Sequence, residues 1–204
     1  MAAVLEDGRS SEEGPKRFFV LSGCSGGGKS SIVAALARRG VAVVPEPGRR
    51  IVEAAEGPRD PVLPWNDLEI FARAAIAMAK ADYEAARSRE GPVVFDRSLI
   101  DAWAALEAVS GKRMPQEESD RHPYASPALL VPPWPEIWQR DEARRHDFSS
   151  ACEEYERLLA IHRRLGYQVV IVPKAPVEER VDFCLARIGH SAETALSTRS
   201  GDHS

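Results

Sequence analysis

The sequence has few cysteines, no excess of positive charge and no long apolar run, and each shortage excludes a class of protein. Cysteines at positions 24, 152 and 184 are too few and too widely spaced for a disulfide framework or a cysteine-rich metal site, so they predict reduced thiols. Acidic residues outnumber basic ones by 31 to 27, so no overall positive field attracts nucleic acid. No apolar run approaches the roughly 18 residues of a membrane span, and the first residues lack the basic-then-apolar order of a signal peptide. We therefore expect a cytoplasmic protein that binds neither nucleic acid nor membrane.

What the sequence does contain fits one α/β domain between two polar ends. Its 204 residues can bury a substantial core, and a hydrophobic share of 44% is ordinary for a globular protein. Residues 1–15 and 190–204 are rich in small and polar residues without periodicity, which predicts disordered tails. No internal repeat or linker divides residues 16–189, so we expect a single domain there.

The most specific motif is a phosphate-binding loop at residues 23–30, where Gly-Cys-Ser-Gly-Gly-Gly-Lys-Ser follows the pattern G-x-x-x-x-G-K-S. An apolar stretch precedes it and a helical pattern follows it, as the motif requires. In such a loop, backbone N–H groups face the α- and β-phosphates, the lysine reaches the β- and γ-phosphates, and the serine hydroxyl binds Mg²⁺. The sequence therefore predicts a site for ATP and Mg²⁺. The residues expected to bind them are Gly23, Ser25, Gly26, Gly27, Gly28, Lys29, Ser30 and Ser31, with Ser30 as the metal ligand.

Short apolar segments alternate with helical patterns along the rest of the domain. Such alternation predicts a parallel sheet covered by helices on both faces, with ligands at the carboxyl ends of the strands. A capping box is expected to open one helix at Asn66 and Glu69 and another at Ser150 and Glu153. The expected strands are 17–22, 41–44, 93–95, 128–131 and 168–172, and the expected helices are 29–39, 48–56, 66–90, 98–109, 150–165 and 176–188.

Charged side chains directly follow two of these strands. Glu46 precedes a proline after the second strand, and Asp96 and Arg97 follow the third, where Asp96 has the form of a Walker B carboxylate that holds Mg²⁺. Two acids beside a phosphate loop suit phosphoryl transfer, one at the metal and one taking the proton of the attacking hydroxyl. Arg97 would grip phosphate oxygens. Taken alone, each acid is equally well explained as a turn residue or a helix cap.

An arginine-rich segment at about 133–147 has the character of a lid. Arg140 and Arg144 are four residues apart and share one face of a helix, where they can neutralise a phosphoryl group while the lid excludes water. A solvated helix is the alternative, because Asp141 and Arg145 have the spacing of an ordinary ion pair.

Two other features also have alternative interpretations. Cys24 lies in the phosphate loop near a helix N-terminus, which would lower the pKa of its thiol, although it also suits a mere filler position. Four aromatic residues can either stack on a planar acceptor or pack in the core, namely Trp65, Phe71, Trp103 and Tyr124.

The order of these motifs resembles that of nucleoside and nucleoside-monophosphate kinases. More closely, three segments are similar to those of a small bacterial family of predicted AAA-type ATPases or kinases of NAD metabolism, which is related to the nicotinamide riboside kinase domain of a bacterial NAD regulator. The segments are Val-Pro-Glu-Pro-Gly-Arg-Arg-Ile at 44–51, Phe-Asp-Arg-Ser-Leu at 95–99 and Pro-Pro-Trp-Pro-Glu-Ile-Trp-Gln-Arg-Asp at 132–141. The resemblance covers about residues 17–188.

The resemblance implies a P-loop NTPase fold, a three-layer α/β/α sandwich around a five-stranded parallel sheet in the order 2-3-1-4-5. It implies Glu46 as the catalytic base, Arg97 as a substrate- or phosphate-gripping residue and Asp96 near Mg²⁺. Kinases of this type often form homodimers, so a homodimer is one implied assembly. Deoxynucleoside kinases carry a Phe-Gln pair where this chain has Phe71, Ala72 and Arg73, and the missing glutamine argues against an unmodified deoxynucleoside as acceptor.

Together these observations predict a Mg-ATP-dependent small-molecule kinase with a nucleoside- or nucleotide-like acceptor. Two alternatives stay open: a regulatory ATPase or nucleotide switch that acts on a protein partner, and a kinase that modifies a macromolecule. The two carboxylates favour a kinase, because a switch needs no acid at an acceptor position. The expected catalytic residues are Lys29, Glu46, Asp96, Arg97, Arg140 and Arg144.

Overall fold

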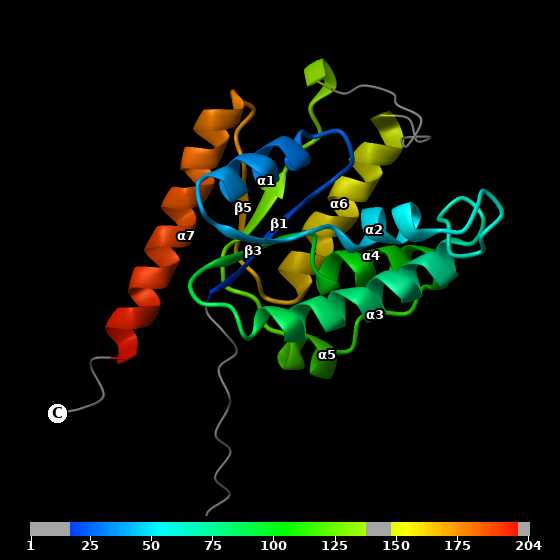
Figure 1. The fold of residues 1–204 in the computed structure, drawn as a ribbon, viewed down its shortest axis with the longest axis horizontal. Coiled ribbons are helices and arrows are strands. Elements are labelled where there is room, and N and C mark those ends of the chain that lie inside the picture. The colour runs from blue at the N-terminus through cyan, green and yellow to red at the C-terminus, as the bar shows by residue number, and fades with distance from the viewer. Residues whose placement is uncertain (1–16, 138–147, 200–204) are drawn as a thin grey trace, which may run out of the picture.

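A five-stranded parallel sheet in the order β2-β3-β1-β4-β5 forms the centre of the molecule (Figure 1). The structure is a computed structural model that describes residues 17–137 and 148–199, with side chains described up to residue 189. The predicted strand order is confirmed. The strands are β1 (Phe18–Gly23), β2 (Ala42–Val44), β3 (Val93–Asp96), β4 (Ala128–Val131) and β5 (Val169–Ile171).

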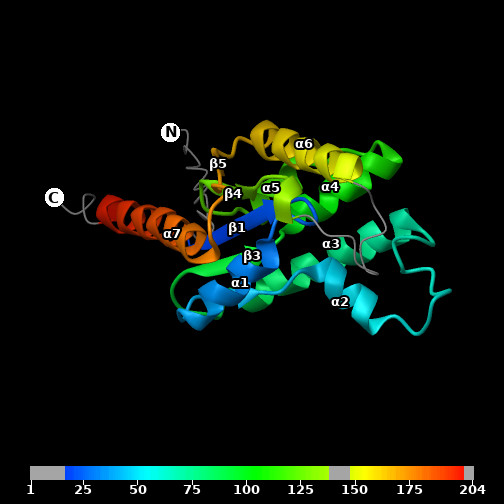
Figure 2. The same ribbon diagram turned by 90° about the horizontal axis from the view of Figure 1, so that it is seen from above.

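Helices connect the strands and cover both faces of the sheet. On one face α1 packs against α7, and on the other α3, α4 and α6 form a layer with the short helix α2 at its end (Figures 1 and 2). The helices are α1 (Lys29–Arg38), α2 (Pro47–Ala54), α3 (Leu68–Ala86), α4 (Leu99–Ser110), α5 (Gln116–Arg121), α6 (Phe148–Arg164) and α7 (Val177–Arg199), with a 3₁₀ turn η1 (Pro135–Ile137). The predicted three-layer α/β/α sandwich is therefore confirmed.

The two faces of β1 explain why this strand can be recognised in the sequence. Phe18 and Val20 pack into the core beneath α3, α4 and α6, whereas Phe19 and Leu21 pack into the core beneath α1 and α7. All four side chains are buried. A strand covered on both sides consists of consecutive apolar residues, unlike the alternating pattern of a half-exposed strand. Its central place also fixes the phosphate loop, which follows it, in the middle of the sheet edge.

Two of the predicted helix starts are wrong. Helix α3 is capped by Asp67, whose side chain accepts a hydrogen bond from the N–H of Ile70 at 2.9 Å. Asn66 instead donates to the carbonyl groups of Pro58 and Asp60 and so belongs to the preceding connector. The aspartate lies one residue nearer the apolar pattern than the asparagine, and both are good N-caps, so composition alone does not separate them.

Helix α6 is already formed at Phe148, so Ser150 and Glu153 lie inside it and do not cap it. The short helix α5 has no counterpart in the sequence prediction, because it is polar and lacks an apolar stripe.

The last helix is longer than the sequence predicts. We expect a helix to about residue 188 and a tail from residue 190, whereas α7 continues to Arg199. Alanine, glutamate and leucine in this stretch are good helix formers and outweigh its serines and threonines. The tail predicted for 1–15, and residues 200–204 of the tail predicted for 190–204, lie outside the described residues. None of the helices in the described part of the chain has the length and apolar character needed to cross a membrane.

Candidate functional site

The phosphate loop connects β1 to α1 in a backbone conformation that requires glycine. Gly23 has φ +131°, and a Cβ atom there would lie 2.3 Å from the carbonyl oxygen of Val131 in β4. Gly28 caps α1 in the left-handed conformation with φ +80°. Because no other residue adopts these angles without strain, the loop can fold tightly against β4 and direct the N-terminus of α1 toward an anion.

A polar cleft of about 120 Å³ lies beside this loop. Its walls come from the loop, the start of α1, the start of α2 and the residue after β3, which lie far apart in the sequence. Most of the predicted site residues meet here, whereas Gly23 and Gly27 contribute backbone behind the wall. The lining residues are Cys24, Ser25, Gly26, Gly28, Lys29, Ser30, Ser31, Glu46, Arg49 and Arg97.

Lys29 and Asp96 form a nearly buried ion pair behind the cleft. Lys29 Nζ lies 3.3 Å from Asp96 Oδ1, and both side chains are less than a tenth exposed. The pair forms because β3 lies next to β1, with Asp96 in register with Leu21 near the loop. The same carboxylate oxygen accepts no hydrogen bond from any described residue, so it keeps lone pairs for a further partner.

The oxygen atoms near the loop fit Mg²⁺. A serine hydroxyl at Ser30 and a carboxylate at Asp96 are the hard donors that this ion prefers. Within the described residues no group of three acidic, histidine or cysteine side chains could hold a metal on its own. Mg²⁺ usually binds through one or two protein oxygens and completes its shell with phosphate oxygens and water, so two donors suffice.

Arg97 links the acid after β2 to α6. Its Nε lies 2.9 Å from Glu46 Oε1 and its Nη1 lies 2.6 Å from Glu154 Oε1. Burial opposes the charge of Arg97, but the carboxylates of Glu154, Glu46 and Asp101 outweigh burial and raise its pKa well above the usual value. Its backbone has φ +64°, a conformation rare outside glycine, and its N–H donates to the carbonyl of Leu21. The guanidinium is therefore held in one place beside the loop.

Glu154 is a site residue that the sequence prediction missed. Its second oxygen accepts a hydrogen bond from the backbone N–H of Ser25 in the phosphate loop at 3.1 Å. Although burial disfavours the charge of Glu154, the ion pair with Arg97 and the Ser25 hydrogen bond lower its pKa below the usual value. No sequence signal marks this residue, because it is one of several glutamates on a charged helix.

A buried hydrogen-bond network supports the segment after β3. Asp101 accepts hydrogen bonds from the hydroxyl of Ser22 in β1 and from the N–H and hydroxyl of Ser98. Ser98 in turn caps α4 through the N–H of Ile100. These contacts hold the start of α4 against β1 and so fix the position of Arg97 relative to the phosphate loop.

Arg49 is a second missed residue, at the start of α2. Its Nη2 lies 3.5 Å from the hydroxyl oxygen of Ser30, and its exposed side chain lines the cleft. Of the described residues, no carboxylate pairs with it. Its place, three residues after Glu46 on a helix, is a signal that sequence reasoning could have used.

Arg180 is the third missed residue and lies on α7, behind the loop. It is 2% exposed, its Nη2 donates to the carbonyl oxygen of Gly27 at 2.8 Å, and its guanidinium lies 5.4 Å from the ring centre of Trp134. Burial lowers its pKa. In the sequence it follows Glu178 and Glu179 and looks like one charge on a solvated helix.

Of the two interpretations of Cys24, the lowered pKa is wrong, and the filler position is consistent with its burial. Burial, followed by the nearby carboxylate of Glu154, raises the pKa of its thiol to about 11 instead of lowering it. Arg97 and Lys29 act in the opposite direction but do not outweigh burial. The helix N-terminus is therefore insufficient to activate a thiol that lies in the apolar core.

The predicted aromatic residues and lid arginines have different outcomes. Tyr124 is buried against Phe95 with ring centres 5.3 Å apart, which is core packing. Trp65 is exposed. Arg140 and Arg144 of the expected lid lie outside the described residues and stay predictions.

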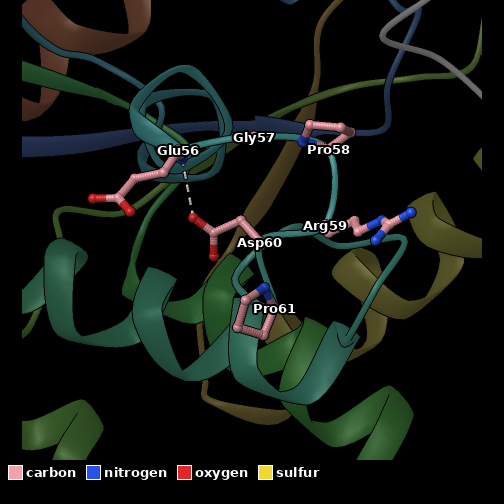
Figure 3. Close-up of a pocket in the computed structure, with 6 residues that line it drawn as sticks. All are labelled: Glu56, Gly57, Pro58, Arg59, Asp60 and Pro61. Carbon is pink, nitrogen blue, oxygen red and sulfur yellow. Dashed lines mark hydrogen bonds between the residues drawn. The ribbon is translucent and has the colours of Figure 1, made fainter.

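A larger hollow of about 420 Å³ lies on the connector between α2 and α3 (Figure 3). It is lined only by the consecutive residues 56–61, among which Asp60 accepts a hydrogen bond from the N–H of Glu56 (Figure 3). The side chain of Arg59 points outward from the loop. The hollow shares no lining residue with the phosphate-loop cleft, so we attribute it to the curved backbone of this connector.

Residues 18–180 match the sequence profile of a family described as an AAA domain. The chain belongs to this family. The match runs from the start of β1 to Arg180 and includes the phosphate loop and both segments that follow β2 and β3. Among curated proteins, none matches this sequence.

Solved structures with a similar fold include deoxyadenosine kinase from M. mycoides and NadR. The kinase with bound dATP has a TM-score of 0.53 at 14% identity, over 84% of this chain and 99% of that chain. The same kinase with bound dCTP has a TM-score of 0.56 at 13% identity, over 85% and 99%. NadR in complex with NR has a TM-score of 0.54 at 19% identity, over 78% of this chain and 46% of NadR. These likenesses establish the fold, and together with the family match they confirm the predicted P-loop kinase-like superfamily.

Proposed function

We propose that this protein is a Mg-ATP-dependent phosphotransferase that moves the γ-phosphate of ATP to a hydroxyl (or phosphate) of a small nucleoside- or nucleotide-like molecule. The observation that carries the proposal is the 2.9 Å ion pair between Glu46 and Arg97 at the wall of the phosphate-loop cleft. Lys29 and Ser30 line the same cleft, which supports the proposal that the Glu46 carboxylate meets an acceptor hydroxyl beside a terminal phosphate. A nucleotide switch does not need an acid at this position.

In the proposed reaction, Glu46 accepts the proton of the acceptor hydroxyl. The acceptor oxygen forms a bond to the γ-phosphorus while the bond from that phosphorus to the bridging oxygen breaks, and ADP leaves with the bridging oxygen. Lys29 and the N–H groups of the loop hold the β- and γ-oxygens. Arg97 orients Glu46 through their ion pair, and Arg49 supplies positive charge beside the transferring group.

The proposed metal ligands are Ser30 and Asp96. Bound there, Mg²⁺ would supply positive charge to the β- and γ-phosphate oxygens. Lys29 holds the Asp96 side chain in place through their ion pair, so the ligand is already positioned before the ion binds. Arg140 and Arg144 are the further cations that we propose for the lid.

A nucleoside-like acceptor is supported by the ligands of the similar structures, which hold dATP, dCTP or NR. The position where deoxynucleoside kinases carry a base-reading glutamine is Ala72, which is buried, and the next residue, Arg73, is exposed and pairs with Glu69 at 2.5 Å. Neither side chain offers an amide to a base, so we do not propose an unmodified deoxynucleoside. A cytoplasmic location and a homodimer stay predictions.

Transfer of radiolabelled γ-phosphate from ATP to panels of nucleosides, nucleotides, vitamins and sugars tests the proposal. Glu46→Gln is expected to lower transfer by about 10²-fold or more while ATP still binds, because an amide cannot take the proton. Glu53→Gln is the matched control, since Glu53 is an exposed glutamate on the same helix α2. It should keep the wild-type rate.

Two results would count against the proposal. A Glu46→Gln protein that transfers phosphate at the wild-type rate would show that Glu46 is not the base. A wild-type protein that hydrolyses ATP slowly, labels no acceptor and is unaffected by Glu46→Gln would favour the regulatory ATPase or switch.

A further inference from the structure

Arg180 is the described residue that the proposed reaction leaves unused and that packing explains least. Its side chain is almost completely buried, and no carboxylate of the described residues pairs with it. Its Nε has no hydrogen-bond partner in the part of the chain that the structure describes. Burying a cation without a counter-charge is costly, so its contacts call for a functional explanation.

The contacts of Arg180 join three separate parts of the chain. From α7, its Nη2 reaches the Gly27 carbonyl oxygen at 2.8 Å, and its guanidinium faces the ring of Trp134, just after β4. A Cβ atom at Gly28 would lie 2.8 Å from Nη1 of Arg180 and 3.0 Å from Cδ1 of Ile137. The guanidinium therefore fills the space directly behind the phosphate loop.

The hydrogen bond to Gly27 fixes the orientation of one peptide group in the loop. In a trans peptide the C=O and N–H bonds point in opposite directions. Because Arg180 holds the carbonyl of Gly27, the N–H of Gly28 points away from Arg180, and Gly28 lines the cleft. A positive charge at the carbonyl also polarises the peptide and makes its N–H a stronger donor to an anion.

We propose that Arg180 is a positioning residue that aligns the Gly27–Gly28 peptide for a nucleotide phosphate, with Trp134 holding the guanidinium in place. Arg180 does not touch the ligand. It lies behind the phosphate loop, where its charge is shielded from solvent, and it acts on the phosphate through the polarised Gly27–Gly28 peptide. The inference rests on the proposed function only for the presence of a nucleotide phosphate at the loop, and it requires no phosphoryl transfer.

Calorimetric titration of Arg180→Met with ATP and ADP tests this role. Methionine keeps a long side chain but removes the charge and the donor, so both nucleotides should bind about tenfold more weakly or worse, the loss expected for a charged hydrogen bond. Arg180→Lys, which keeps the charge, should lie between this variant and the wild type. Arg187→Met is the matched control: Arg187 lies on the same helix, with its guanidinium 4.2 Å from the ring of Phe183, and the change should alter both affinities by less than about twofold.

The ¹⁵N chemical shift of the Gly28 amide gives a readout that a general packing role would not move. This nitrogen shares a peptide group with the Gly27 carbonyl, so losing the hydrogen bond should shift its signal in nucleotide-free protein. The amide signals of α7 residues far from the loop should stay in place.

The outcomes separate the inference from the proposed function. A wild-type protein that binds neither nucleotide would overturn both. If the wild type binds and a folded Arg180→Met protein binds equally well, the inference fails while the proposed kinase stands. If Arg180→Met loses cooperative unfolding, the Arg180→Lys protein decides the question. An Arg180→Lys protein with wild-type nucleotide affinities and an unchanged Gly28 signal would overturn the inference. Weaker nucleotide binding with a shifted Gly28 signal would support it.

Discussion

A half-buried arginine, Arg97, and a buried arginine, Arg180, flank the phosphate loop, and their surroundings are opposite in kind. Arg97 is held by the carboxylates of Glu46 and Glu154, whereas the polar and aromatic contacts of Arg180 within the described residues are with the carbonyl of Gly27 and the ring of Trp134. The first guanidinium is neutralised within the protein, so its contribution at the cleft is mainly to orient its partners. No carboxylate of residues 17–137 or 148–189 neutralises the second, so within this part of the chain it leaves net positive charge behind the loop.

The two arginines also differ in backbone. Arg97 has a positive φ, which for a residue with a Cβ persists only where surrounding contacts hold it, and Arg180 lies in a regular helix. The strained backbone and the ion pairs belong to Arg97, on the cleft side of the loop. Arg180, on the other side, carries a charge that no described carboxylate balances. Removing each arginine should therefore change different properties.

The largest expected effect is on stability. Arg97→Met removes the guanidinium that pairs with both Glu46 and Glu154, so we expect the free energy of unfolding to fall by about 3–5 kcal/mol. For Arg180→Met we expect a loss of about 1 kcal/mol or less, because the lost hydrogen bond is offset by removing an unpaired buried charge. Urea unfolding of the two variants measures the difference. If both variants lose the same unfolding free energy, the carboxylates around Arg97 do not make it more important for stability than Arg180.

A smaller effect on stability is expected from Glu154, which pairs with Arg97 and has no counterpart among the described residues around Arg180. Its pKa is lowered in the folded protein, so its contribution to stability is present above its usual pKa of 4.5 and is lost as the pH falls through the lowered value. Glu154→Gln should therefore be about 1–3 kcal/mol less stable than the wild type at neutral pH, and this difference should shrink below about pH 4.5.

The matched control for this change is Glu156→Gln, an exposed position on the same helix. Its unfolding free energy should follow the wild-type curve between pH 7 and pH 3. A Glu154→Gln protein whose deficit stays constant down to the lowest pH would mean that the ionised carboxylate is not the source of stability.

The smallest effect concerns the two thiols beside these arginines. Burial raises the pKa of Cys24, near Arg97, to about 11 and that of Cys184, near Arg180, to about 12. Both should stay unmodified by iodoacetamide at pH 8, while the half-buried Cys152 reacts. Peptide mass spectrometry after brief alkylation measures this order. Rapid labelling of Cys24 would show that the loop environment activates its thiol after all.

The sequence was sufficient to predict that Arg97 lies near the phosphate loop, but it was not sufficient to predict this for Arg180. Arg97 follows a short apolar strand, and residues that follow strands of a parallel sheet gather at one edge, so position alone brings Arg97 near the loop. Arg180 lies on a helix where Glu178, Glu179 and Asp182 surround it in sequence, and its contact with Gly27 depends on how α7 packs against α1.

The same reason explains the other successes and failures. The five strands and their order follow from local apolar runs and from the family resemblance, and the glycines of the loop follow from its motif. Glu154 and Arg49 depend on helix faces and on packing angles that no local pattern specifies. The pKa of Cys24 depended on a balance between helix N-terminus and burial, and only the three-dimensional surroundings show that burial is the larger effect.

The hydrogen bond between Arg180 and Gly27 joins residues 153 positions apart. During synthesis on the ribosome, the glycine-rich motif emerges early, whereas the guanidinium behind it arrives only with α7. A nascent chain that stops before α7 would therefore carry the complete sequence motif of a nucleotide site without the residue that we propose aligns it. Tight binding of a nucleotide phosphate would then follow only after α7 has been synthesised and has docked.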